Sequence, residues 1–345
     1  MRIFLYGAAL LWATGVLGAW ASLYVLDSPS FWEALWALSL PAWALLGLGL
    51  LLWAALARRW GIAALALLCG AGTLLQAGWR PWGPEEVRDT QAAFGVLSWN
   101  VHGAASGFAP VLEAILRDEP DLVLLQEVQN SGPALIAQDP IRYGDFRHAL
   151  RAHGYHVAFA PDRQEAWASY GLLVASRWPF VRVRRLNLGG RPGSGLMADV
   201  AVQGRIVRLI TVHLYTTGSE KPWRGAFSWD RWRTWLSQMR YGWRARGREL
   251  EELLAIVNRS PYPVLLAGDF NTTPFDRYYV RLRRVLRDAH RTAGWGWGGT
   301  YSAAKPLLRI DYQWYTAGLR PLTLEAKPTW ASDHRPLLGK WTLWP

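Results

Sequence analysis

The chain has 345 residues, 51% of them hydrophobic and 19% charged, and its formal net charge is +12 at pH 7. This length is enough for more than one structural unit, and the excess positive charge favours an anionic partner. The single cysteine, Cys69, excludes a disulfide within the chain.

Residues 1–79 are predicted to form a membrane anchor. The runs 3–26, 34–57 and 60–79 contain no charged side chain, and each has about the ~20 residues that a helix needs to cross the hydrocarbon layer. A cleaved signal peptide is the alternative, because residues 19–21 resemble a cleavage site. Two further apolar runs follow that site, which favours three transmembrane helices.

The arginines between the apolar runs predict the orientation of this anchor. Arg2 precedes the first run, and Arg58 and Arg59 separate the second from the third. Lys and Arg favour the cytoplasmic side, so the N-terminus is expected inside. Three crossings then place the rest of the chain outside, which makes the protein a multi-pass protein of the cell membrane with an extracytoplasmic domain.

A polar linker at residues 80–93 leads into one large domain at 94–345, in which strand-like segments dominate. Helical spacing of apolar residues occurs at 108–116 and 250–257. Strands are predicted at 95–101, 121–128, 155–160, 170–176, 205–215, 262–270, 310–315 and 336–343. Many strands with a few interleaved helices indicate two packed sheets with helices outside.

Several of these strands end on the same kinds of polar residue. The residues at these ends are Asn100, Glu127, His213, Asp269, Asn271, Asp311, Asp333 and His334. One such end, the "GDFN" at 268–271, is also what an ordinary turn would contain. The repetition argues against turns alone, because these residue types hold a hard divalent cation and activate water beside it.

With these motifs the chain resembles the endonuclease/exonuclease/phosphatase superfamily, and in layout its membrane-anchored bacterial branch. The matching segments are "LSWNVHG", "LLQEV", "GLLVASRWP", "TVHL", "GDFNTTP", "RIDYQW" and "SDHRP", in this order over residues 95–337. The resemblance implies an α+β fold, the four-layer αββα sandwich of DNase I-like proteins, here preceded by three transmembrane helices. It also implies a metal-dependent hydrolase of phosphoester bonds.

The resemblance implies a metal-binding group and two residues that shape the site. Glu127 resembles the main metal-binding carboxylate of the family, with Asn100 beside it and Asp333 as a further candidate. Oxygen ligands without cysteine indicate Mg²⁺ or Mn²⁺. Thr300 and Arg309 match a weaker part of the pattern and are expected to shape the site.

The resemblance also implies catalytic roles. His334 resembles the histidine that contacts the scissile phosphate or handles a proton, and Asp311 resembles its orienting partner. Asp269 resembles the residue that aligns or deprotonates the attacking water. Asn271 would donate to the phosphoryl oxygens, and His213 resembles a phosphate-side acid or hydrogen-bond donor. Whether the Asp or the His is the general base stays open at this point.

The stretch 221–248 is rich in tryptophan and arginine and includes Trp229, Trp232 and Trp235. Such a mixture suits a helix lying in the headgroup layer of a membrane, single-stranded nucleic acid, or an ordinary exposed segment. The predicted anchor favours the membrane. The leading interpretation is therefore a phosphoesterase acting on a lipid-linked phosphate or pyrophosphate at the outer face, with the lipid bilayer as partner. The alternative is an extracytoplasmic nuclease acting on nucleic acid.

Overall fold

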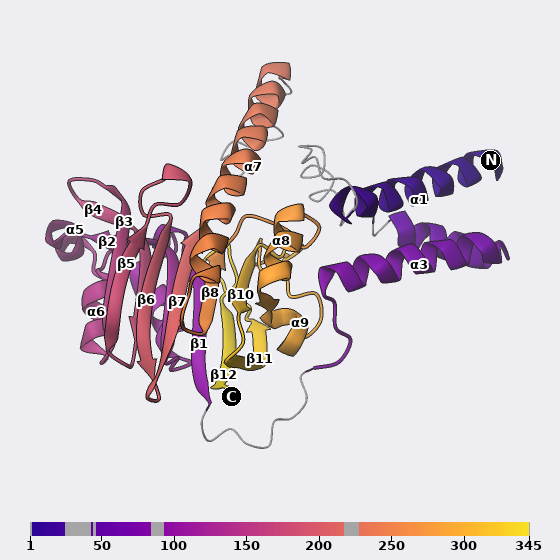
Figure 1. The fold of residues 1–345 in the computed structure, drawn as a ribbon. Helices are drawn as coiled ribbons and strands as arrows, with labels where there is room; N and C mark the ends of the chain where they lie inside the picture. Colours follow the sequence, from indigo (N-terminus) through magenta and orange to yellow (C-terminus); the bar gives the residue numbers. More distant parts are fainter. Residues whose placement is uncertain (1, 25–42, 44–45, 84–92, 217–227, 345) are drawn as a thin grey trace. The chain divides into compact units, whose positions relative to one another are not determined.

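Figure 1 shows the computed structural model of the chain, which describes residues 2–24, 43, 46–83, 93–216 and 228–344. The chain forms two compact units. The first contains Met1–Trp79 and Thr272–Arg284, and the second contains Arg80–Asn271 and Val285–Pro345.

The first unit is helical. It contains α1 (Arg2–Tyr24), a helical stretch at Leu46–Leu56, α3 (Trp60–Ala77) and most of α8 (Arg277–Val285). Trp12 and Val16 of α1 are buried in one apolar cluster with Ala66 and Cys69 of α3. The segment before α8 joins this unit too, since the Gln76 Nε2 donates to the Pro274 carbonyl oxygen at 2.7 Å.

The structure supports one membrane-spanning candidate where the sequence predicts three. Within the described residues, Trp60–Ala77 is long and apolar enough to cross a membrane by length and composition. The stretches Ala9–Gly18 and Leu46–Leu56 are apolar helices that fall short of the ~20 residues a crossing needs. Residues 25–42, which include the start of the second predicted span, lie outside the described residues.

The second unit is built on two six-stranded mixed sheets. The first sheet has the order β11–β12–β1–β2–β4–β3, and the second has the order β5–β6–β7–β8–β10–β9. The strands of the first are β1 (Phe94–Asn100), β2 (Leu122–Ser131), β3 (His156–Gln164), β4 (Ala168–Ser176), β11 (Leu319–Ala326) and β12 (Leu337–Leu343). Those of the second are β5 (Phe180–Leu186), β6 (Gly195–Val202), β7 (Arg205–His213), β8 (Val264–Asp269), β9 (Arg287–Asp288) and β10 (Asp311–Tyr315).

Two apolar cores define the layers of this unit. One lies between the sheets and joins Val96 and Leu122 of the first sheet to Ala198 and Leu209 of the second. The other lies on the opposite face of the first sheet, under helices. Those helices are α4 (Phe108–Leu116) and α6 (Phe146–Ala152), which contribute buried apolar side chains to it.

The remaining helices are shorter, apart from α7. They are η1 (His102–Ala104), α5 (Pro133–Gln138), η2 (Leu188–Gly190) and α9 (Ala289–Ala293). Helix α7 (Trp229–Asn258) contacts η2 and buries Leu250, Leu253 and Val257. Two mixed sheets packed face to face with helices outside confirm the predicted α+β sandwich.

One glycine sets the spacing of the two strands that carry most of the site. Gly268 of β8 has φ +144°, and a Cβ there would lie 2.0 Å from the carbonyl oxygen of Val212 in β7. Only glycine fits so close an approach. It lets β7 and β8 pair in parallel up to His213 and Asp269, which are partners in register.

Candidate active site

The ends of four strands, together with the segments around Glu127 and His334, bring the predicted polar residues together in the second unit. Asp269 at the end of β8 is the register partner of both His213 on β7 and Asp311 on β10. Asn100 ends β1 in the other sheet, and its Nδ2 donates to the Asp269 Oδ2 at 3.1 Å. The site therefore lies where the two sheets meet at one end.

Glu127 enters this cluster through an irregularity in β2. The pairing of β2 with β4 shifts register between Leu125 and Val128, and Glu127 has φ +53°. A left-handed conformation is unfavourable for glutamate and costs on the order of 1–3 kcal/mol. The bulge turns the carboxylate toward Asn100, whose Nδ2 donates to the Glu127 Oε1 at 2.8 Å.

His334 and Asp311 form a buried pair. The His334 Nδ1 lies 2.9 Å from the Asp311 Oδ2, and both side chains are at most 7% exposed. Burial lowers the pKa of His334, but the charge and hydrogen bond of Asp311 outweigh it and raise the pKa to about 10. The imidazole is therefore held protonated, with its Nε2 3.8 Å from the Asp269 Oδ2.

The surroundings of Asp269 disfavour its charged form, in contrast to those of His334. Burial raises its pKa, the Asp311 carboxylate raises it further, and the two nearby histidines offset only part of this, so the pKa is about 6. Its Oδ1 accepts the backbone N–H of Asn271 at 2.8 Å. Asp269 thus titrates close to neutral pH while it is held in place by its neighbours.

His213 lies between the two carboxylates that come from different sheets. Its Nε2 is 3.6 Å from the Glu127 Oε1 and 3.8 Å from the Asp269 Oδ2. Burial raises the pKa of Glu127, but His213 and the Asn100 amide outweigh it and hold the pKa below its usual 4.5. Glu127 is therefore ionised at neutral pH, as a metal ligand must be.

Two predicted residues have partners that bear on their expected roles. Asn271 uses its Nδ2 to donate to the Leu214 carbonyl oxygen at 3.0 Å, which leaves its second amide hydrogen for a substrate. Asp333 lies at the edge of the cluster, where its Oδ1 faces the His102 Nδ1 at 3.4 Å. The catalytic and metal-binding roles of both stay predictions.

Thr300 and Arg309 each make a buried contact beside the site. The buried Thr300 Oγ1 accepts the backbone N–H of Ile310 and of Asp311, each at 3.3 Å, and so fixes the start of β10. The Arg309 guanidinium makes a buried ion pair with Asp288 at 2.7 Å. Both contacts are consistent with the expected shaping role.

Three further residues support the site, although no motif assigned them a role. The Trp99 indole donates to the carbonyl oxygen of His334 at 2.9 Å, and the Ser332 hydroxyl donates to that of Asn100 at 2.8 Å. The ring of Tyr301 lies 4.9 Å from that of His334. Trp99 and Ser332 flank motif residues in the sequence, whereas nothing in the sequence marks Tyr301.

The tryptophans of the predicted membrane surface lie in the first turns of α7. Trp229 is 70% exposed, while Trp232 and Trp235 are half-buried and their rings meet edge to face at 5.6 Å. The part of the tryptophan-rich stretch at 221–227 lies outside the described residues. The described part is helical, and the membrane-surface role of these tryptophans stays a prediction.

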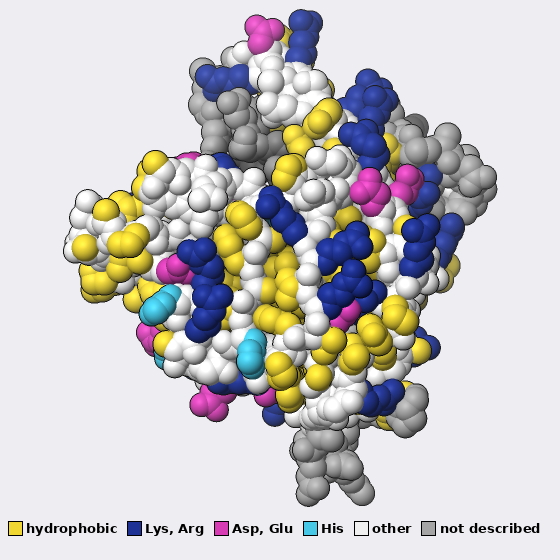
Figure 2. Space-filling model, turned by 60° about the vertical axis from the view of Figure 1, so that its left-hand side comes forward, with side chains coloured by type: hydrophobic (Ala, Val, Ile, Leu, Met, Phe, Trp, Pro, Cys, Tyr) yellow, Lys and Arg dark blue, Asp and Glu magenta, His cyan; other side chains and the backbone are white. Residues whose placement is uncertain are grey.

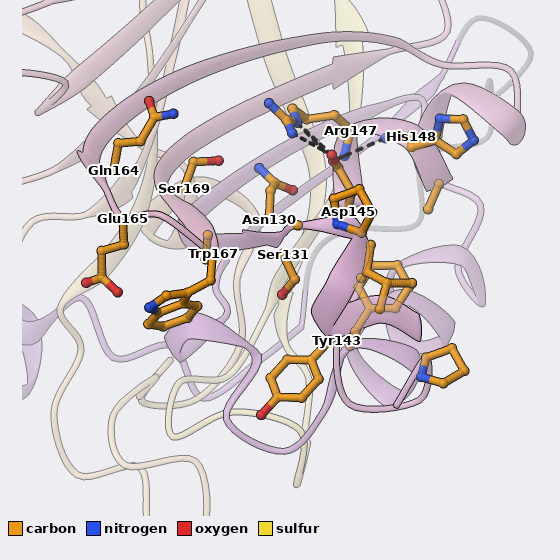
Figure 3. A pocket seen from close by; sticks show the side chains of 18 of the residues that line it. Asn130, Ser131, Tyr143, Asp145, Arg147, His148, Gln164, Glu165, Trp167 and Ser169 are labelled. Atoms are coloured by element: carbon orange, nitrogen blue, oxygen red, sulfur yellow. Dashed lines mark hydrogen bonds and ion pairs between the residues drawn. The ribbon is translucent and has the colours of Figure 1, made fainter. Parts of the chain in front are cut away.

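A cavity of about 690 Å³ is lined by residues of the C-terminal end of β2, the first turn of α6 and the strands β3 and β4 (Figure 3). Trp167, Tyr143 and Asn130 contribute to its wall, and the Asp145 carboxylate there is held by Arg147 at 2.5 Å. Among the described residues that line this cavity, none belongs to the predicted site. The cavity is therefore separate from the catalytic cluster.

The donor set of the cluster suits a divalent metal. Ligand atoms of Glu127, His213 and Asp269 lie within 4.8 Å of one another, as do those of Asp269, Asp311 and His334. The first group is the better candidate, because His334 is engaged with Asp311 and held protonated. A cluster of carboxylates and one imidazole can hold a divalent cation.

Comparison with known proteins agrees with this geometry. Residues 97–334 match the model of the Endonuclease/Exonuclease/phosphatase family. No curated protein sequence matches the chain.

Solved structures share the fold at low sequence identity. An endonuclease/exonuclease/phosphatase from Beutenbergia cavernae is 23% identical with a TM-score of 0.50, over 73% of this chain and 72% of that one. The human Nocturnin catalytic domain with bound sulfate is 19% identical with a TM-score of 0.51, over 73% and 94%. A family protein from Leptotrichia buccalis is 16% identical with a TM-score of 0.51, over 72% and 100%. At these identities the likeness supports the fold alone.

Proposed function

Because the chain belongs to the endonuclease/exonuclease/phosphatase family, we propose that it hydrolyses a lipid-linked phosphate ester or pyrophosphate at the outer face of a membrane. Members of this family are metal-dependent hydrolases of phosphoester bonds, and the chain is such an enzyme. The observation that carries the proposal is the meeting of Asn100, Glu127, His213, Asp269, Asp311 and His334 at one end of the two sheets.

Glu127 is the central ligand for Mg²⁺ or Mn²⁺ in this proposal, with Asn100 beside it and Asp269 and His213 within reach. Such a cation would neutralise charge on the phosphoryl oxygens. The hydrogen bond from the Asn100 Nδ2 keeps the Glu127 carboxylate oriented. Asp333 lies further out, beside His102, and would act on the site through that contact.

Two perturbed pKa values support the proton-handling roles in this proposal. His334, with its pKa raised to about 10, is protonated at neutral pH and cannot accept a proton from water. Asp269, with a pKa of about 6, is mostly ionised there and still basic enough to accept one. In this proposal Asp269 deprotonates the attacking water, while His334 and Asn271 donate hydrogen bonds to the phosphoryl oxygens.

The membrane part of the proposal is supported by the exposed apolar surface of the first unit. Leu68 and Leu75 of α3 are 69% and 66% exposed, and Leu11 of α1 is 72% exposed. A helix from the core of a soluble protein would bury such side chains, and large exposed apolar surfaces mark contact with membranes or partners. We infer a membrane anchor at 1–79 that includes the candidate span Trp60–Ala77, a linker at 80–93 and an extracytoplasmic catalytic domain at 94–345.

Nucleic acid is the second candidate substrate, and the distribution of positive charge supports it. Figure 2, which brings the left-hand side of Figure 1 forward, shows many Lys and Arg side chains around an exposed hydrophobic surface. On the edge strand β5, Arg182, Arg184 and Arg185 are exposed, next to Val181 and Val183 at 58% and 45%. Such a surface attracts phosphate backbones as well as anionic lipids.

One experiment distinguishes the two substrates. The full chain, reconstituted in vesicles with Mg²⁺, is assayed in parallel on polyprenyl pyrophosphate, sphingomyelin and plasmid DNA, with a soluble phosphodiester as reference. Replacement of Trp229, Trp232 and Trp235 by Ser should lower turnover of the lipid and leave the soluble diester unchanged. Cleavage of DNA that exceeds lipid turnover, and that falls in the triple variant, would overturn the lipid assignment in favour of the nuclease.

A further inference from the structure

A buried glutamate on α7 holds the backbone that follows His213. Glu249 is 1% exposed. Its Oε2 accepts the backbone N–H of Tyr215 at 2.7 Å, and its Oε1 accepts from the Arg191 Nε at 2.8 Å. The carboxylate therefore connects the long helix, the η2 turn region and the segment after β7.

Two arginines complete this attachment. Arg191 also donates through its Nη2 to the carbonyl oxygen of His213. Arg246, one turn before Glu249 on α7, donates through its Nη1 to the carbonyl oxygen of Tyr215 at 2.9 Å. The peptide groups on both sides of Leu214 are thus held by charged, buried or half-buried groups, which form stronger hydrogen bonds than neutral ones.

The packing leaves α7 little freedom to shift against this segment. A Cβ on Gly242 would lie 2.5 Å from the Thr216 carbonyl oxygen, and one on Gly189 would lie 3.0 Å from the Glu249 Cγ. The helix and the loop are in direct contact at both places. The loop position is consequently determined by α7 and not by β7 alone.

This attachment bears on catalysis because the carboxylates that face His213 are farther from its imidazole than Asp311 is from that of His334. Its Nε2 stands 3.6 Å from the Glu127 Oε1 and 3.8 Å from the Asp269 Oδ2. Because these distances are long, the orientation of the His213 imidazole depends on the position of the His213 backbone. A displacement of about 1 Å at a reacting group can cost on the order of 10²-fold in rate.

We propose that Glu249, together with Arg191, is a positioning residue for His213. The inference rests on the proposed phosphoesterase function of the same site. Glu249 does not touch the substrate; it fixes the His213–Tyr215 backbone so that the imidazole faces Glu127 and Asp269. Removing a charged carboxylate from water is costly even when it is fully hydrogen-bonded. The positioning of His213 explains why Glu249 is buried at this place in the fold.

The test is a double-substitution cycle on the full chain with a soluble phosphodiester and Mg²⁺. Glu249→Gln keeps an acceptor for Tyr215 and removes the ion pair to Arg191. We expect kcat to fall about 10- to 100-fold with KM nearly unchanged. In a His213→Ala background the same change should have almost no further effect, because the residue it positions is gone. Equal losses in the two backgrounds would overturn the proposal.

A matched control and a second measurement keep the outcome decisive. Glu252 is one turn further along α7 and accepts the Gly189 N–H at 3.1 Å, so Glu252→Gln removes the same charge and should leave kcat unchanged. If Glu249→Gln fails to fold, Arg191→Gln replaces it in the same cycle.

Hydrogen exchange separates this proposal from the proposed function. The Tyr215 amide should exchange faster in Glu249→Ala, which removes its acceptor, and not in Glu252→Ala. Unchanged exchange at Tyr215 contradicts the anchoring. A wild-type chain that hydrolyses no phosphoester contradicts the proposed function, whatever the exchange shows.

Discussion

His290 offers a test of the structure that is independent of the metal site. It lies in α9 and is 5% exposed, and its imidazole is enclosed by the backbone of the following loop. A Cβ on Gly294 would lie 2.2 Å from its Nδ1, and one on Gly298 would lie 2.4 Å from its Cε1. Burial lowers the pKa of His290, the charge of Arg309 lowers it further, and the result is a pKa of about 4 against an ordinary 6.5.

The sign and size of the pH effect follow from these two values. Between pH 6.5 and 4 the unfolded chain binds a proton at this position more tightly than the folded chain does. This contribution to the free energy of unfolding is fully present above pH 6.5 and is lost as the pH falls toward 4. The loss between pH 7 and pH 4 is about 3 kcal/mol. For a domain of this size that corresponds to about 6–12 °C in Tm.

The assay is thermal unfolding of the full chain in detergent at pH 7, 6, 5 and 4, for wild type and for His290→Gln. The variant carries no titrating group at this position, so its Tm should fall between pH 7 and 4 by about 6–12 °C less than that of wild type. Acidic residues contribute equally to both chains and cancel in the comparison. His148→Gln, at an exposed histidine, should follow wild type. Parallel Tm curves for wild type and His290→Gln would refute the buried neutral imidazole.

The remaining predictions concern the site and the topology. Activity on a phosphodiester should vanish with EDTA and return with Mg²⁺ or Mn²⁺. Glu127→Gln should raise the metal concentration needed for half-maximal activity by about 10- to 100-fold. Activity that persists in EDTA would contradict the metal dependence and the metal-binding role of Glu127. Asp311→Asn removes the charge that raises the pKa of His334, so the imidazolium should lose its proton at a lower pH than in wild type. The value of kcat should fall about 10²-fold or more at pH 8 and by less at pH 6. A loss of kcat that does not depend on pH would mean that Asp311 acts in another way. A reporter active only outside the cytoplasm should work when fused after Pro345 and fail when fused after Arg59, and the opposite pattern would place the catalytic domain inside.

The sequence predicted the strands that carry the site because their ends combine a buried apolar run with a polar residue of a restricted type. The predicted strand at 262–270 corresponds to β8 at Val264–Asp269, and the one at 205–215 to β7 at Arg205–His213. The convergence of these ends could be expected from the family resemblance. It could not be expected from the strands alone, because pairing partners are set by contacts distant in the sequence.

Other features had no comparable signal. Strand β5 alternates valine with arginine and is exposed on both faces, so it lacks the apolar run of a buried strand. The bulge at Glu127 depends on the shifted pairing of β2 with β4. The contact of His102 with Asp333 and the place of Glu249 beside Tyr215 arise from packing between elements. The motifs marked Glu127 and Asp333 as site residues, but nothing in the sequence indicated the bulge, the contact with His102 or the place of Glu249.

The arrangement of the site also has a consequence during synthesis of the chain. Asn100 and His334 both contact Asp269, although they lie far apart in the sequence on either side of it. Contacts over such separations form late, because the entropy of closing long loops must first be overcome. A ribosome makes Asn100 and Glu127 long before Asp311 and His334 emerge, and the N-terminal parts of a chain fold first. The nascent enzyme is therefore inert until the last of these residues is in place, so hydrolysis begins only with a finished domain.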